Sequence, residues 1–169
     1  MQNDPIDIRC PKCGHVAHFH EPFRFTCVIR HSELPKNSHL WGRVVVEELF
    51  PEHFSWQQPD TPKPTFHQGK EPGPGYRLNH RGMAECQSCG TLEKATISWP
   101  EDAYWQWNID GYELVARNRE HAQMILAYLR ERKRAPNRKP ALRHIPTAML
   151  TKQLAPVVQN RVERALEQA

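Results

Sequence analysis

Two short cysteine motifs carry the clearest chemistry in this 169-residue chain. The pattern Cys-x-x-Cys-Gly begins at Cys10 and is repeated at Cys86. Zinc takes four ligands in a tetrahedron, and four thiolates in two such pairs are the ligand set of a structural zinc site. A glycine after the second cysteine favours the required tight turn, because glycine adopts positive φ without a Cβ clash. The sequence therefore predicts one structural Zn²⁺ ion held by Cys10, Cys13, Cys86 and Cys89.

Other chemistry is open to the same cysteines. The segment Cys-Pro-Lys-Cys is superficially similar to a thioredoxin-like redox pair, but such a pair begins a helix in a βαβ unit. Here Ile6 and Ile8 alternate with polar residues before Cys10, which indicates a strand, and no helical pattern follows Cys13. Disulfides would suit a secreted protein, but the chain opens without the apolar run of a signal peptide. Redox, disulfide and free-thiol interpretations stay open beside zinc.

The fifth cysteine and three histidines are further candidates. Cys27 lies in a strand-like stretch, where we expect a buried free thiol. His15, His18 and His20 follow the first cysteine motif and could replace a cysteine as ligands. His18 and His20 occupy alternate strand positions, so both imidazoles face one side and could form a second metal site.

The two Cys-x-x-Cys-Gly motifs resemble the knuckles of zinc-ribbon proteins, in which two β-hairpins share one ion. The stretches 97–104 and 114–121 are also similar to a group of uncharacterised bacterial zinc-ribbon proteins. This resemblance implies a bacterial protein with an antiparallel β core, and it implies no activity. Ribbons usually place about 15–20 residues between the cysteine pairs, whereas 72 residues separate Cys13 from Cys86. The ion would therefore close a long insertion.

Composition limits the class of protein. Hydrophobic residues make up 38% of the chain and the mean hydropathy is −0.75, which is lean for a large core and favours a metal-assisted fold. No apolar run approaches the ~18 residues that a membrane span needs. We expect a soluble, cytoplasmic protein, because reduced thiols there can hold zinc.

Positive charge is concentrated in one segment. The formal net charge of the chain is +4, and residues 130–143 alone carry seven cations against one glutamate. Such a run could neutralise several phosphates and make nucleic-acid binding strongly salt-dependent. The same charges also suit a helix C-terminus followed by a solvated linker. The candidate nucleic-acid-binding residues are Arg130, Arg132, Lys133, Arg134, Arg138, Lys139 and Arg143.

The pattern of residues predicts an α+β fold with a zinc-ribbon-like antiparallel β core, a long insertion between the knuckles and a helical C-terminal half. We assign residues 1–116 to the β domain, with the insertion at 31–80, and residues 117–169 to the helical region. Residues 42–50 are rich in β-branched side chains and predict a strand. Residues 59–75 predict an irregular loop, because they are rich in proline and glycine.

A β-hairpin is predicted around Asp110-Gly111, because a two-residue type I′ turn needs positive φ at both positions. The register pairs Trp107 with Leu114 and places aromatic and apolar side chains on one face. That face either packs under the next helix, or exposes Trp105, Trp107 and Tyr112 as a platform for stacking nucleic-acid bases.

Three helices are expected after the hairpin. Asn118 is a favourable N-cap for the first, at about 119–133, whose apolar residues recur with helical spacing. Two later prolines can start further helices. We place these helices at 147–154 and 157–168.

The predicted function is a non-catalytic zinc-binding adaptor or nucleic-acid-associated module within a larger protein or nucleoprotein assembly. The alternative is a protein that binds DNA or RNA directly through residues 130–143. A metal-dependent enzyme is less favoured, because four cysteines leave no open zinc position for water. We expect a protein or nucleic-acid partner, no small-molecule substrate and no membrane.

Overall fold

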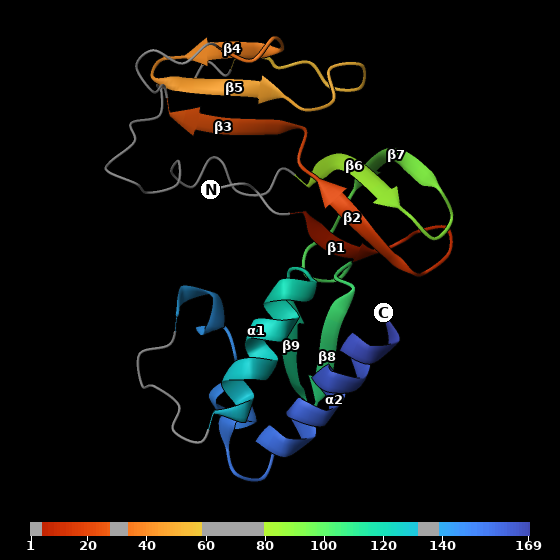
Figure 1. Ribbon diagram of the computed structural model, residues 1–169, viewed down its shortest axis with the longest axis vertical. Coiled ribbons are helices and arrows are strands. Elements are labelled where there is room, and N and C mark those ends of the chain that lie inside the picture. The colour runs from red at the N-terminus through yellow and green to blue at the C-terminus, as the bar shows by residue number, and fades with distance from the viewer. Residues whose placement is uncertain (1–4, 28–33, 59–79, 132–138) are drawn as a thin grey trace.

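The computed structural model of the protein describes residues 5–27, 34–58, 80–131 and 139–169. Within these ranges, nine strands form three antiparallel sheets and are followed by two α-helices. The fold is therefore α+β with a helical C-terminal end, as predicted. Figure 1 shows three parts in succession, which are a three-stranded sheet, a four-stranded sheet and a hairpin that packs with the helices.

The four-stranded sheet joins two hairpins from either side of the insertion. Its first hairpin is β1 (Ile6–Arg9) and β2 (Val16–His20), and its second is β6 (Arg81–Cys86) and β7 (Thr91–Thr96). The strand order is β1-β2-β6-β7, with every neighbouring pair antiparallel. One face carries a small core, which consists of Ile6, Ile8, Cys10, Ala17, Phe19, Ala84, Cys86 and Ile97.

The three-stranded sheet combines one strand that precedes the predicted insertion at 31–80 with two strands that belong to it. It consists of β3 (Phe23–Cys27), β4 (Ser38–Trp41) and β5 (Val44–Glu48), in the order β3-β5-β4. The strand predicted at 42–50 is β5, and its Val44 and Val46 pack with aromatic residues around Trp41. The loop predicted at 59–75 lies outside the described residues.

The C-terminal hairpin has the predicted register. Trp107 of β8 (Trp105–Ile109) pairs with Leu114 of β9 (Tyr112–Ala116). The turn residues have φ values of 53° and 77°, as a type I′ turn requires. Trp105 and Trp107 are buried, so the interpretation of this face as core is confirmed and the base-stacking alternative is excluded for these two side chains.

The first helix begins where predicted and ends earlier. Asn118 is the N-cap of α1 (Arg119–Arg130), and its side chain accepts a hydrogen bond from the backbone N–H of His121. The helix ends at Arg130 rather than near 133, because Glu131 has extended backbone angles (φ −63°, ψ 127°).

The helix predicted at 147–154 is not formed. A 3₁₀ turn covers Thr147–Leu150, and Thr151 then adopts an extended conformation. The Thr151 hydroxyl donates to the carbonyl of Ala148 and accepts from the N–H of Leu154, which competes with helical hydrogen bonds. The last helix, α2 (Ala155–Gln168), starts two residues earlier than predicted, because a proline fits within its first turn.

The hairpin and the helices share one hydrophobic core. We call β8, β9, α1, α2 and their described connections the helical unit. The predicted division of the chain at residue 116 stays a prediction, although the buried apolar side chains of β8 and β9 belong to the same core as those of the helices. No described helix is long and apolar enough to cross a membrane. The core of the helical unit consists of Trp105, Trp107, Ile109, Leu114, Ala116, Ala122, Ile125, Leu126, Tyr128, Leu129, Leu142, Ile145, Met149, Ala155, Val158, Val162 and Leu166.

Candidate metal centre

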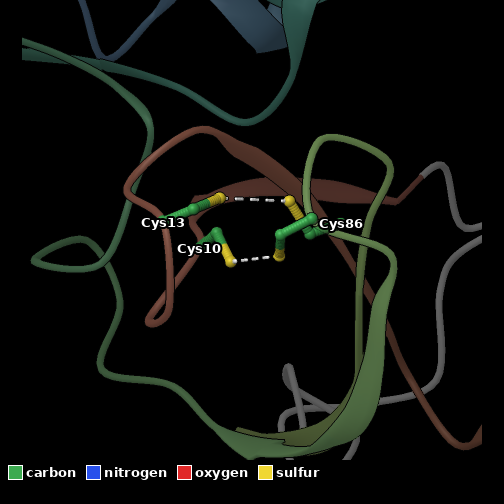
Figure 2. Close-up of side chains that lie close together, drawn as sticks. Cys10, Cys13 and Cys86 are labelled. Carbon is green, nitrogen blue, oxygen red and sulfur yellow. Dashed lines mark hydrogen bonds between the residues drawn. The ribbon is translucent and has the colours of Figure 1, made fainter.

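The four motif cysteines meet at one end of the four-stranded sheet. Their sulfur atoms all lie within 4.8 Å of one another. The Sγ–Sγ distance is 3.7 Å between Cys10 and Cys89 and 3.6 Å between Cys13 and Cys86 (Figure 2). A tetrahedron with Zn–S bonds of ~2.3 Å has S–S edges of about 3.8 Å. Both measured distances therefore fit a tetrahedral metal site, and each one bridges the two hairpins.

The backbone turns place the sulfurs. The first knuckle (Cys10–Gly14) is the turn between β1 and β2, and the second (Cys86–Gly90) is the turn between β6 and β7. Gly14 and Gly90 have φ values of 76° and 69°, in the left-handed region that favours glycine. In the first knuckle the N–H of Gly14 donates to the carbonyl of Cys10 at 2.9 Å.

Each knuckle contributes one buried and one exposed cysteine. Cys10 and Cys86 are buried as members of the sheet core, whereas Cys13 and Cys89 are exposed. The site therefore lies where the small core of the sheet meets solvent. A bound ion would connect the core side chains of both hairpins directly.

Hydrogen bonds favour the thiolate form at two of the four positions. Backbone hydrogen bonds from Cys13 and Lys12 lower the pKa of the Cys10 thiol. The hydroxyl and the backbone of Thr91 lower the pKa of Cys89 to about 6. These donors suit a metal ligand, because the thiolate is the form that binds metal.

The pKa of a third thiol, Cys13, is raised because four sulfurs lie close together. A backbone hydrogen bond from His15 acts to lower the pKa of Cys13, but partial desolvation and hydrogen bonds with the other three cysteines raise it to about 12. A bound dication reverses this balance, since a coordinating thiol is deprotonated outright. The donor set therefore fits a metal ion.

A lysine links the two hairpins beside the sulfurs. The Nζ of Lys12, in the first knuckle, lies 2.8 Å from a carboxylate oxygen of Glu93 on β7. The hydrogen bond with Glu93 raises the pKa of Lys12, and the charges of Cys89 and Cys10 act in the same direction. This cation partly offsets the negative charge of the thiolates.

The neighbouring histidines are bound to carboxylates instead. The Nδ1 of His18 lies 2.9 Å from Asp7, and the Nε2 of His20 lies 3.1 Å from Glu85. His15 is exposed. Among the described side chains, the four cysteines are the only group of three or more potential ligands. The possible second metal site at His18 and His20 is therefore not found among the described residues, and the side chain of Cys27 lies outside the described part.

The predicted nucleic-acid-binding residues are only partly described. Arg132, Lys133, Arg134 and Arg138 lie outside the described ranges. Arg130 is the last residue of α1 and forms an ion pair with Glu163 of α2. Lys139 and Arg143 are exposed at the two ends of a 3₁₀ turn over Pro140–Leu142.

One residue of the region was missed by sequence reasoning. Asp7 alternates with Ile6 and Ile8, a pattern that predicts a solvent-facing carboxylate, yet it is only 3% exposed. The helical unit covers it, through hydrogen bonds from Trp105 and Arg119. An acidic residue three positions before a ligand was the available signal, but its partners are about 100 residues away in the sequence.

Comparisons of the chain with protein-family models, with curated proteins and with solved structures give no match. The zinc-ribbon resemblance therefore gains no support from relatives. The metal centre rests on its own geometry and donor chemistry.

Proposed function

We propose that the protein is a non-catalytic module whose four-stranded sheet is held by one structural zinc ion, and that it acts as an adaptor in a larger assembly. The observation that carries the proposal is the meeting of four cysteine sulfurs from two distant motifs. Four thiolates fill the tetrahedral shell of zinc, so no position is left for the water or substrate that a catalytic zinc needs. The role of the metal is then structural.

Two edge strands support a protein partner. β4 and β7 are the outermost strands of their sheets, and each presents a leucine that is more than half exposed, Leu40 at 55% and Leu92 at 56%. An outer strand offers backbone groups that can pair with an extended segment of another protein. These two strands are therefore candidate docking edges.

The orientation of the β7 backbone follows from one hydrogen bond. The N–H of Ile97 donates to the carbonyl of His80 at 2.7 Å, which continues the ladder between β6 and β7. Because hydrogen-bonded and non-hydrogen-bonded pairs alternate along an antiparallel ladder, the backbone groups of Leu92, Lys94 and Thr96 point to the outer edge. A docking peptide would bond to these three residues.

Direct nucleic-acid binding is the alternative, and the net charge of +6 over residues 130–143 is the observation that favours it. Against it, Arg130 is already paired with Glu163, and the tryptophans that could stack on bases are buried. Seven cations would still give a steep salt dependence if they contact phosphates.

Elemental analysis of natively purified protein tests the metal. We expect one zinc per chain in the wild type and loss of zinc in Cys86→Ser. Cys27→Ser should keep its full zinc content, since Cys27 lies on β3 of the three-stranded sheet. Iron is measured in the same samples, because a tetrahedral site of four sulfurs also suits iron. Protein that contains neither metal would overturn the proposal.

Co-purification from native lysate, with and without nuclease, tests the adaptor role. We expect a protein partner that survives nuclease and is lost in Leu92→Lys, with Leu34→Lys as the matched control because Leu34 is also exposed. Recovery that disappears with nuclease, or binding that weakens steeply with salt, would support the nucleic-acid alternative instead.

A further inference from the structure

A buried carboxylate connects the metal-binding sheet with the helical unit. Asp7 lies on β1, three residues before Cys10, and it is the only polar or charged residue among the buried residues that the structure describes. Burying a charge is costly unless it is paired and hydrogen-bonded. The partners of Asp7 therefore indicate what its position stabilises.

Both oxygens of the Asp7 carboxylate are hydrogen-bonded. Oδ1 lies 2.9 Å from the Nδ1 of His18 on β2, within the same sheet. Oδ2 accepts from the indole Nε1–H of Trp105 at 2.6 Å and from the backbone N–H of Arg119 at 2.9 Å. Trp105 and Arg119 belong to the helical unit, so one carboxylate joins two parts of the molecule.

The backbone of β1 follows the same interface. The N–H of Asp7 donates to the carbonyl of Arg117 at 2.7 Å, and its carbonyl accepts from Tyr104 at 3.0 Å. The N–H of Arg9 donates to the carbonyl of Asp102 at 3.0 Å. β1 therefore runs along the segment that enters β8 and the segment that leaves β9, at the side of the sheet nearest α1 (Figure 1).

Arg119 extends this connection to both helices. It is the first residue of α1, where backbone N–H groups lack intrahelical acceptors and a negative charge is favourable. Its guanidinium donates to the carbonyl oxygens of Leu166 and Ala169 at the end of α2 and lies 5.8 Å from the ring centre of Trp105. A shift of Asp7 would therefore disturb the start of α1 and the end of α2 together.

The position of Asp7 also depends on the first knuckle. β1 leads into Cys10, and β2, which carries His18, starts at Val16, three residues after Cys13. Without a bound ion, no metal–sulfur bonds join the first knuckle to the second. Opening of the first knuckle would release the strand that holds the carboxylate.

We propose that Asp7 transmits metal occupancy to the helical unit. In the metal-bound protein its carboxylate holds the first turn of α1 and the indole of Trp105 against the sheet, and metal loss releases both. This inference rests on the proposed metal site. The centre of α1 stays folded in either state, because the core of the helical unit contains no residue of the four-stranded sheet.

Coupling of this kind is reciprocal. If metal binding strengthens the contact between Asp7 and the helical unit by some factor, then that contact strengthens metal binding by the same factor. Such factors are typically about 5- to 150-fold. Asp7→Asn should therefore weaken zinc binding within that range. Asp110→Asn is the matched control, because Asp110 is exposed in the hairpin turn and asparagine tolerates its positive φ.

A second variant separates the loss of the contact between Asp7 and the helical unit from the loss of the Asp7 charge. Asp7→Asn also removes a negative charge from the sheet, which weakens cation binding by itself. Trp105→Phe removes the indole donor to Asp7 without changing the charge of the sheet, and it keeps an aromatic ring in the core. It should weaken zinc binding in the same direction as Asp7→Asn, by a smaller factor.

Amide hydrogen exchange of the full chain, with zinc and after chelation, tests the transmission. In wild type, chelation should speed exchange at residues 119–122 by at least about tenfold, with residues 125–129 unaffected, and should change the total tryptophan emission more than it does in Trp105→Phe. Zinc-saturated Asp7→Asn should already exchange rapidly at 119–122. A wild-type protein that binds zinc but shows the same exchange at 119–122 after chelation would overturn the inference and leave the proposed function intact. Equal zinc affinity of wild type, Asp7→Asn and Trp105→Phe would overturn it too, whereas failure to bind metal would overturn both.

Discussion

The four-stranded sheet and the helical unit bury apolar side chains to very different extents. The core of the sheet has eight members, of which two are cysteine ligands and two are alanines. The core of the helical unit has seventeen members, which include two tryptophans and all the buried leucines of the described residues. Full burial of a large apolar side chain contributes about 1.5–3 kcal/mol, so the helical unit has far more hydrophobic stabilisation.

This difference explains why the cysteines occur in the sheet. A structural zinc site contributes about 10–16 kcal/mol at neutral pH, which is comparable to the stability of a whole domain. A sheet with a small core can fold with that contribution, while the helical unit does not need it. The two regions should therefore respond differently to metal loss and to core substitutions.

Substitution of Cys86 should have the largest effect, because it removes a ligand and a core side chain together. We expect Cys86→Ser to lose zinc and the amide protection of β1, β2, β6 and β7, while residues 125–129 of α1 stay protected. Hydrogen exchange followed by mass spectrometry measures both regions in one sample. Simultaneous loss of protection in α1 would show that the two regions form one cooperative unit.

A cavity in the core of the helical unit should lower stability without loss of zinc. Ile125 is fully buried, and Ile125→Ala should lower the free energy of unfolding by about 2–5 kcal/mol without changing zinc content. Met124→Ala, on the exposed side of the same helix, is the matched control and should cost much less. Chemical denaturation with parallel zinc analysis checks this prediction, and loss of zinc in Ile125→Ala would contradict it.

A smaller change within the sheet tests its packing. A Cβ atom at Gly82 would lie 2.2 Å from the carbonyl oxygen of His20 and 2.7 Å from the ring of Phe19, so β2 and β6 must separate. Gly82→Ala should cost about 1–3 kcal/mol and weaken zinc binding. Thermal melting with excess zinc and competition with a chelator measure both effects. A wild-type melting temperature would contradict the close approach of the two strands.

The smallest expected effect concerns the helical unit at acidic pH. His121 accepts a hydrogen bond at Nδ1 from the N–H of Arg117 and lies 2.8 Å through Nε2 from the carbonyl of Ala141, which fits the neutral ring. Burial lowers the pKa of His121, and the charges of His144 and Arg117 act in the same direction. The unfolded chain therefore binds the proton more readily.

The contribution of neutral His121 to the free energy of unfolding is complete above the pKa of about 6.5 in the unfolded chain, and it is lost as the pH falls below that value. His121→Gln should show a shallower loss of stability than wild type between about pH 7 and pH 5, and His53→Gln, at an exposed position, should follow the wild type. Denaturation midpoints at several pH values measure the slopes. Identical slopes in all three proteins would exclude the proposed role of His121.

Local signals account for most of what the sequence predicted. The hairpin register follows from Asp110-Gly111, because positive φ at two adjacent residues selects one turn type. The start of α1 follows from Asn118, whose side chain accepts one free N–H of the first turn. The four cysteines are distant in sequence, but their close approach could be predicted because two Cys-x-x-Cys pairs together form the ligand set of one zinc ion.

Features that depend on distant packing or side-chain competition could not be predicted. The alternation of Asp7 with two isoleucines describes a sheet with one solvent-facing side, and nothing local indicates that the helical unit covers Asp7. The helix expected at 147–154 fails because the hydroxyl of Thr151 bonds to nearby backbone groups, which helical periodicity does not report.

The separation of the two knuckles also sets an order of events during synthesis. At about 5–20 residues per second, a ribosome needs roughly 4–15 s to travel from Cys13 to Cys86. Throughout that interval the nascent first hairpin has two thiols without their counterparts and a β2 edge that awaits β6. Until β6 has been made, the free thiols of the first hairpin can be oxidised and the edge of β2 can pair with other strands, whereas the elements of the helical unit follow one another closely in the sequence.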